Sequence, residues 1–179
     1  MAEQYRLYGE LGVRYMFEES AGDGTSPLQP LRSYVRSQLT WNPYQNTESL
    51  VAEFMENYYG YGGKYVEKYF NAVMEHFQNI YTMAGEACQG CFYDVSKTNY
   101  WPHSTLLEFC SLLENAMLEI DVQTTLDENQ KEIYKERVFR EYVLMKINEY
   151  NRYSGFLTPE ELAEVKRIVD IGKSRYEIA

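Results

Sequence analysis

The chain has 179 residues, a formal net charge of −10 at pH 7 and 45% hydrophobic residues, among them 18 tyrosines. This apolar content predicts one packed domain, whereas the acidic excess argues against nucleic acid or an anionic membrane as a partner, since both attract clustered Lys and Arg. No apolar run approaches the ~20 residues that span a bilayer, and the first residues lack the basic start and apolar core of a signal peptide. The location of the protein, cytoplasmic or secreted, stays undetermined.

The first 43 residues predict a helix, a strand and a second helix. The first helix covers residues 3–11 and is closed by Gly12, a residue type favoured just past a helix end. Residues 13–17 are β-branched and aromatic, which is typical of a strand. A capping box that begins at Ser26 opens the second helix, which must end near residue 41 because Asn42 precedes a proline.

After residue 43 the sequence predicts only helices. In each, apolar residues recur every three or four positions, and several begin at a capping residue or end at a glycine. The predicted helices cover residues 47–59, 63–84, 105–120, 127–153 and 158–169, with a long loop over residues 85–103. Helices of this length favour an antiparallel bundle.

A lone strand is a structural problem, because its N–H and C=O groups need a sheet and no second strand is predicted. A helix–strand–helix segment with carboxylates at the end of the strand, here Glu18 and Glu19, is typical of the last unit of a (β/α)8 barrel. We therefore predict a mainly α fold. Residues 1–43 would be a strand–helix remnant of a barrel, and residues 44–179 an antiparallel helical bundle. An unpaired strand edge would also favour self-association into a homo-oligomer.

Several stretches of the chain are shared with one bacterial family. They are residues 12–18, 31–34, 39–43 with Trp41-Asn42-Pro43, 53–54 and 58–60, and the later residues 134–138 also fit. With them the chain resembles domain of unknown function 4838, whose glycosidase-like barrel is similar to those of α-glucuronidases and β-hexosaminidases. One departure is the pair Ser37-Gln38, where the family usually has a small residue and Lys.

The resemblance implies a role in carbohydrate metabolism. In that family the last barrel unit runs into a helical C-terminal domain, and the first seven strands, which would carry most sugar-binding and acid–base residues, are absent from this chain. The chain would support the barrel of a glycoside hydrolase and could shape a rim of its carbohydrate cleft, without being catalytic alone. Its partners would be the remainder of the parent barrel and a carbohydrate. The alternative is an independent helical module that binds carbohydrate or protein.

Glu18 and Glu19 are the first candidates for a sugar site. A glycosidase needs two carboxyl groups about 5 to 9.5 Å apart, but neighbouring residues of a strand point to opposite faces, so these two are not a catalytic pair. One of them could bind a sugar hydroxyl. The other interpretation is a solvated loop start, or an ion pair with Arg32 or Arg36. We assign no catalytic residue.

Exposed aromatic residues are the second set of candidates. Tyr61, Tyr100 and Trp101 lie in predicted turns or loops, where a ring could contact a sugar. The alternative for each is packing against a neighbouring helix.

The turn at residues 41–43 is predicted to be structural. Trp41 would anchor the barrel helix to the bundle with a buried ring, and Asn42 would satisfy carbonyl groups at the helix end. Pro43 and Arg32 belong to the same structural set. Sugar stacking on Trp41 is the alternative.

Cys88 and Cys91, with His103 and Cys110 downstream, form the one arrangement that resembles a metal site. Structural zinc usually takes two closely spaced ligand pairs, and here there is one pair. We therefore predict buried thiols, no metal and no cofactor.

Overall fold

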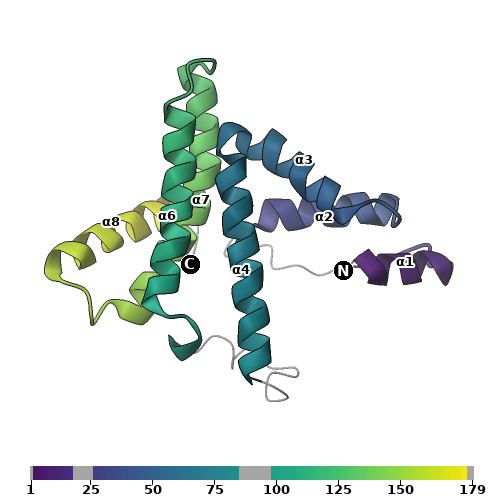
Figure 1. Ribbon diagram of the computed structural model, residues 1–179, viewed down its shortest axis with the longest axis horizontal. Coiled ribbons are helices and arrows are strands. Elements are labelled where there is room, and N and C mark those ends of the chain that lie inside the picture. Colours follow the sequence, from purple (N-terminus) through teal and green to yellow (C-terminus); the bar gives the residue numbers. More distant parts are fainter. Residues whose placement is uncertain (1, 18–25, 85–97, 177–179) are drawn as a thin grey trace.

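The computed structural model describes residues 2–17, 26–84 and 98–176, and within them every regular element is a helix. Figure 1 shows their arrangement. The α-helices are α1 (Ala2–Glu10), α2 (Gln29–Trp41), α3 (Thr47–Tyr59), α4 (Gly63–Ala84), α6 (His103–Asp121), α7 (Glu128–Tyr153) and α8 (Pro159–Tyr176), and two 3-10 turns are η1 (Gly60–Gly62) and η3 (Thr98–Tyr100). None of these helices is long and apolar enough to cross a membrane.

Side-chain caps explain where several helices begin. The Asp127 carboxylate accepts from the N–H of Gln130, and the Gln130 side chain accepts from the N–H of Asp127, which is the reciprocal capping box of α7. Thr158 and Glu161 exchange the same two bonds before α8. The cap of α3 is Asn46, which directly precedes the helix. Its side chain accepts from Ser49 N–H at 2.9 Å.

Three helices form the centre of the molecule. α4, α6 and α7 run side by side, and α6 and α7 are joined by a short turn at one end (Figure 1). The α2–α3 pair extends to one side with α1 beside it, and α8 extends to the other and packs on α7. The mainly helical fold is thus confirmed for the described residues, while α2, α3 and α8 point away from the axis of α4, α6 and α7.

One hydrophobic core links the two segments that were predicted as separate domains. Leu31, Val35 and Leu39 of α2 belong to the same buried cluster as the central residues of α4, α6 and α7. These three residues are spaced four apart, so they form one stripe along α2. The cluster also includes Tyr5 of α1. Helix α2 therefore shares its core with the helices that follow.

The strand predicted for residues 13–17 is not formed, and that prediction is wrong for this structure. The segment has no regular secondary structure, and the side chains of Tyr15 and Phe17 are 95% and 90% exposed. The physical reason is the lack of a partner. A strand is stable only beside another strand, and the described part of the chain contains none.

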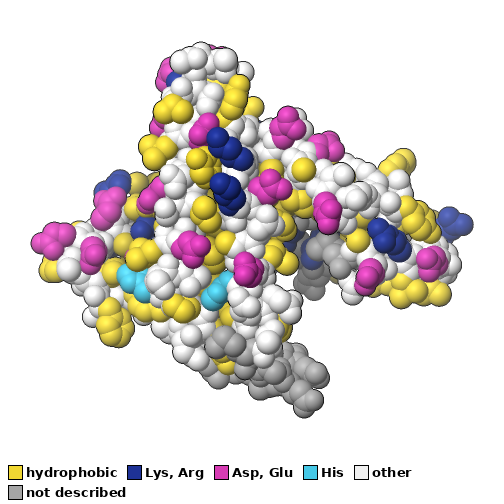
Figure 2. Space-filling model, in the orientation of Figure 1, with side chains coloured by type: hydrophobic (Ala, Val, Ile, Leu, Met, Phe, Trp, Pro, Cys, Tyr) yellow, Lys and Arg dark blue, Asp and Glu magenta, His cyan; other side chains and the backbone are white. Residues whose placement is uncertain are grey.

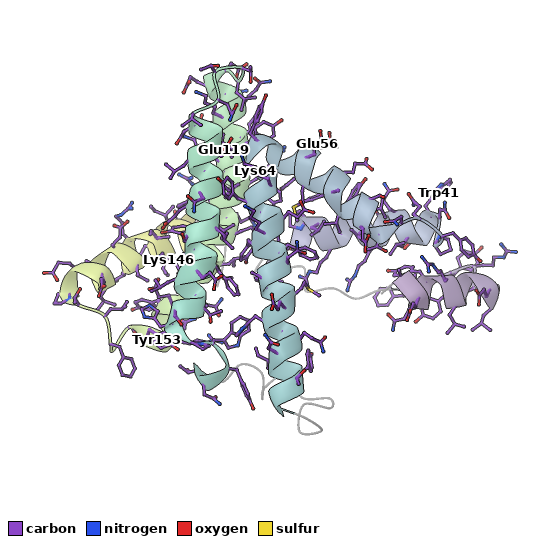
Figure 3. The ribbon with its side chains drawn as sticks, in the orientation of Figure 1. Trp41, Glu56, Lys64, Glu119, Lys146 and Tyr153 are labelled. Atoms are coloured by element: carbon purple, nitrogen blue, oxygen red, sulfur yellow. The ribbon has the colours of Figure 1, made fainter. Side chains whose placement is uncertain are left out.

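The prediction that Trp41 is a buried anchor is also wrong. Its side chain is 90% exposed, and Figure 3 shows it at the outer end of the α2–α3 pair. Residues two apart in a helix differ by about 200° around the axis. Trp41 follows the buried Leu39 by two positions, and therefore points away from the stripe that packs in the core.

Candidate functional site

Among the described residues, those predicted to contact sugar do not form one site. Glu18 and Glu19 lie outside the described residues. Tyr61 precedes the start of α4, whereas Trp101 packs against Phe77, 14 residues further along that helix. At 1.5 Å per residue the two positions are roughly 20 Å apart along α4. A single sugar ring cannot contact both.

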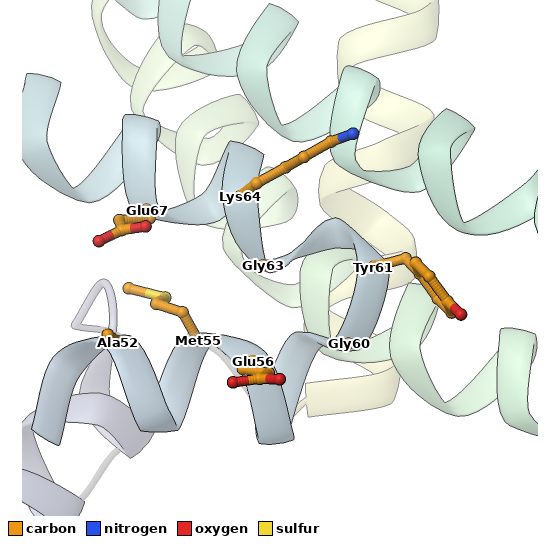
Figure 4. Close-up of a pocket in the computed structure, with 8 residues that line it drawn as sticks. All are labelled: Ala52, Met55, Glu56, Gly60, Tyr61, Gly63, Lys64 and Glu67. Atoms are coloured by element: carbon orange, nitrogen blue, oxygen red, sulfur yellow. The ribbon is translucent and has the colours of Figure 1, made fainter. Parts of the chain in front are cut away.

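Tyr61 borders a shallow pocket between the end of α3 and the start of α4 (Figure 4). The pocket has a volume of about 310 Å³, and its other lining includes Glu56, Glu67 and Lys64. The Lys64 ammonium points out of the pocket, toward α6, and pairs with Glu119 at 3.1 Å. The Tyr61 hydroxyl lies 3.0 Å from the Thr125 hydroxyl. The polar groups at this pocket are thus partly engaged within the protein.

Tyr100 and Trp101 are tied to the neighbouring helices, Tyr100 through its backbone carbonyl and Trp101 through its ring and its carbonyl. The carbonyl of Tyr100 lies 2.7 Å from His76 Nε2, and the Trp101 ring packs on His76 with centroids 4.8 Å apart. The Tyr153 hydroxyl donates to the carbonyl of Trp101 at 2.6 Å. These contacts favour packing over sugar binding for the Trp101 ring.

The outer end of the α2–α3 pair carries exposed apolar side chains, which we call the outer surface. Its members come from the segment after α1 and from the turn after α2, and they are Leu11, Val13, Tyr15, Met16, Phe17, Trp41 and Tyr44. Helix α1 itself contacts the turn after α2, since Arg6 of α1 donates to the carbonyl of Pro43 at 3.4 Å. Figure 2 shows hydrophobic side chains at this end, whereas Asp and Glu are spread over the visible face. Large exposed apolar patches usually mark interaction sites.

Asn42 and Pro43 shape the turn in this surface. The Asn42 backbone N–H donates to the carbonyl of Gln38, which satisfies one carbonyl at the end of α2. Its side-chain oxygen accepts from Tyr44 N–H at 3.1 Å. The predicted helix-end role of Asn42 is therefore carried by its backbone, and its side chain shapes the turn.

The opposite end of α2 is held by a buried carboxylate. Leu28, just before α2, has a left-handed φ of 54° and no side-chain cap, and its N–H donates to Glu141 Oε2 of α7 at 2.8 Å. Glu141 is 1% exposed. A helix start leaves its first N–H groups without acceptors, so Glu141 supplies from a distant helix the cap that the local sequence lacks.

Polar groups of four helices surround Glu141. They are Arg32 of α2, Tyr59 of α3, Tyr69 of α4 and Arg140 of α7. The buried hydroxyls of Tyr59 and Tyr69 have no hydrogen-bond partner among the described residues. Burial raises the pKa of Glu141 to about 7, against the opposing effects of the Leu28 hydrogen bond and of the two arginines. Arg32, predicted as structural, thus contributes to this cluster.

A second polar cluster lies between α6 and α7. Glu149, 3% exposed as a side chain, accepts from Lys146 at 2.8 Å and lies 2.7 Å from His103 Nε2. Burial raises the pKa of the neighbouring Cys110 thiol to about 12, so this thiol is protonated and a poor nucleophile. Within the described residues no group of three or more potential ligands could hold a metal ion. Cys88 and Cys91 lie outside those residues.

A second pocket, of about 300 Å³, opens between α2, α3 and α7, and we call it the aromatic–arginine pocket. It is lined by Tyr34, Glu53, Phe54, Asn57, Tyr58 and Arg137. Phe54 stacks on Tyr58 with ring centroids 4.7 Å apart, and Tyr34 lies 5.3 Å from Phe54. The Arg137 guanidinium carbon lies 4.3 Å from the centroid of the Tyr58 ring. Three aromatic rings and one cation therefore share a single wall.

Neither Glu141 nor Arg137 was predicted as important from the sequence. For Glu141 a signal existed, because it lies three positions from Val138 and one from Tyr142, both inward-facing. A carboxylate within the apolar stripe of a helix indicates a buried polar contact. For Arg137 the local sequence offers only Tyr134, three positions earlier on α7 and with its ring centroid 5.8 Å from the guanidinium carbon, because the aromatic residues of the pocket come from α2 and α3.

Residues 1–71 match the family model described as Domain of unknown function (DUF4838). The match covers α1, α2, α3 and the start of α4, which includes the outer surface. The remainder of the chain lies beyond it. No curated protein and no solved structure matches the chain.

Proposed function

We propose that this chain is the C-terminal helical domain of a glycoside hydrolase, in which it braces the last unit of a (β/α)8 barrel. It would not hydrolyse a glycoside alone. The match of residues 1–71 to a domain-of-unknown-function family supports a shared architecture for this part of the chain. The proposed barrel remnant and the antiparallel bundle belong to the same hypothesis.

The observation that carries the proposal is the outer surface. Tyr15, Phe17 and Trp41 each have at least 90% of their area exposed. Burying an aromatic side chain contributes roughly 1.5 to 3 kcal/mol, so leaving three in water forgoes a large stabilisation. A partner that covers them would recover it.

Residues 13–17 fit a strand that lacks its neighbours. Their β-branched and aromatic composition favours a strand, while their backbone has no regular structure. A barrel would supply the adjacent strands and hence the missing hydrogen bonds. The α2 helix would then cover this strand, as helices do in βα units.

The test is reconstitution with the preceding region of the parent gene. That region should encode strand–helix units; expressed as a separate polypeptide, it should bind this chain and bury the Trp41 indole, seen as a blue shift of its fluorescence. Trp41→Ala combined with Phe17→Ser should weaken the complex at least about tenfold, because hot-spot aromatics each contribute about 2 kcal/mol. Turnover of aryl-glycosides by the isolated chain would contradict the proposal.

A matched control separates contact from folding. Phe156 is also large, apolar and 84% exposed, but it lies between α7 and α8 at the other side of the molecule. Phe156→Ser should leave the complex unchanged. Equal weakening by this control would show that general stickiness, and not the outer surface, drives the association.

A second candidate function is an independent module that binds carbohydrate or protein. The aromatic–arginine pocket favours it, because pockets with apolar walls and a few polar groups suit small ligands. Calorimetry of the isolated chain against a glycan panel separates the two functions. A purely bracing domain should release no heat with any glycan.

A further inference from the structure

Among the described residues, Arg137 has no carboxylate that pairs with its positive charge. Its Nη1 donates to the carbonyl of Tyr58 at 2.7 Å, and no carboxylate among the described residues forms an ion pair with it. The chain holds 27 acidic and 17 basic residues, so acidic partners are abundant. In such a protein an arginine that lines a pocket without an ion pair is informative.

Two contacts hold the guanidinium group of Arg137 in one orientation. Stacking on Tyr58 at 4.3 Å and the bond to the Tyr58 carbonyl fix the plane of the guanidinium. A planar guanidinium has five N–H donors and matches a carboxylate with two parallel bonds. Because one amino group is already bonded, a carboxylate would take the remaining donors without a new conformational search.

The other residues that line the aromatic–arginine pocket indicate which ligand shape would fit. Tyr34, Phe54 and Tyr58 line the pocket beside the cation and give it an apolar aromatic wall, which suits the apolar part of a ring. Exposed Glu53 and Asn57 line the pocket from α3, where the Glu53 carboxylate is hydrogen-bonded to Tyr34 and the Asn57 amide donates to the carbonyl of Glu53 at 2.8 Å. A volume of about 300 Å³ accommodates one ring with its substituents.

We propose that the aromatic–arginine pocket binds a small ring-shaped molecule that carries a carboxylate, with the carboxylate on Arg137 and the ring against the aromatic wall. This site does not depend on the bracing function, since none of its residues belongs to the outer surface. An aromatic acid and a cyclic sugar acid share this chemistry. The experiment distinguishes them.

The experiment is an NMR titration of the isotope-labelled chain with four probes. The carboxylates are 4-hydroxybenzoate and D-galacturonate, and their neutral counterparts are 4-hydroxybenzyl alcohol and D-galactose. At least one carboxylate should shift the amide signals of α3 and of α7 near Arg137, and should bind at least about tenfold more tightly than its neutral counterpart, as expected for a charge-assisted bond. The carboxylate that binds identifies the source of the ring.

Variants locate the effect on the guanidinium. Arg137→Gln should weaken binding at least about tenfold, and Arg137→Lys, which keeps the charge but loses the fork, should weaken it several-fold. Lys64→Gln is the matched control, because Lys64 lines the other pocket, is already paired with Glu119, and should not matter. Circular dichroism checks that each variant is folded.

Three results would overturn the proposal. They are no saturable binding of either carboxylate, equal binding of the neutral counterparts, and unchanged binding by folded Arg137→Lys and Arg137→Gln chains. None of these results bears on the association of the outer surface with a barrel.

Discussion

The two ends of α2 differ in what holds them. At its start the N–H of Leu28 donates to a carboxylate that is buried inside the protein. At its end Trp41 extends into solvent. Between them Leu31 and Leu39 are buried in the same core. Helix α2 is therefore bonded to α7 at its start, whereas its last residue extends into solvent.

The difference shows that size and apolarity do not decide which residue ties a helix to its neighbours. Trp41 has a larger and more apolar side chain than Glu141, but it lies off the buried stripe of α2. Glu141 is charged and would cost free energy in a core unless it is bonded, and it is bonded to a helix start that lacks any other cap. The tie between the helices is polar and buried.

The largest expected effect is at the buried end. Glu141→Ala should lower the free energy of unfolding by about 3 to 4 kcal/mol at pH 5, because it leaves a cavity and removes the acceptor of Leu28 N–H. Urea unfolding followed by circular dichroism measures it. Glu141→Gln is the control, since its amide oxygen can accept the same bond; an equal loss in both variants would mean that this bond contributes little.

The pH dependence should reveal the same carboxyl group. The folded pKa of about 7 lies above the ordinary value of 4.5, so between these two values the folded chain binds more protons than the unfolded chain. Stability from this group is therefore present at low pH and falls as the pH rises, by about 3 kcal/mol in total, and the fall ends above pH 7. The groups that face Glu141 are Arg32, Arg140, Tyr59 and Tyr69.

Denaturation curves at pH 5 and pH 8 check this expectation. The informative quantity is the difference between wild type and Glu141→Gln, because it cancels the contributions of all other groups. The variant should lose less stability than wild type over this interval. Parallel curves for the two proteins would show that Glu141 keeps an ordinary pKa.

An intermediate effect on stability is expected at the cap of α3, which follows the exposed end of α2 in the chain. Asn46→Ala should cost about 1 kcal/mol, because it removes the acceptor of Ser49 N–H at the start of α3. Asn46→Asp should retain most of the stability. Thermal unfolding of the three chains gives the comparison, and a loss as large as that of Glu141→Ala would remove the contrast between the two ends.

The smallest expected effect is at the exposed end itself. Trp41→Ala should change the stability of the isolated chain by less than about 0.5 kcal/mol, as surface substitutions usually do. Urea unfolding measures this change, and binding to the reconstituted barrel should suffer much more. A loss above about 3 kcal/mol in the isolated chain, as for a buried tryptophan, would show that the ring is packed after all.

Several helices were predicted closely from local patterns. The predicted helices over residues 47–59 and 63–84 coincide with α3 and α4, and the predicted start at residue 127 is the cap of α7. Periodic apolar residues, capping side chains and glycines act within a few positions of each other, so they can be read from one stretch. The buried stripe of α2 followed from the same rule.

The candidate sites were predicted poorly because they depend on contacts between distant residues. Glu141 and Leu28 are 113 positions apart, and Arg137 and Tyr58 are 79 apart. Nothing local indicates which helix faces will meet. The aromatic residues that were selected as exposed, such as Trp101, turned out to pack on α4, since exposure is decided by the neighbouring element.

The sequence by itself determined the helices, the cap of α7 and the apolar stripes, because these depend on side chains that are neighbours along the chain. Only the tertiary structure decided that Glu141 is buried as the cap of α2 and that Trp41 is exposed, since burial depends on which helices pack together. The segment at residues 13–17 shows the same division. Its composition favours a strand, but its conformation depends on a partner strand, and the described part of the chain supplies none.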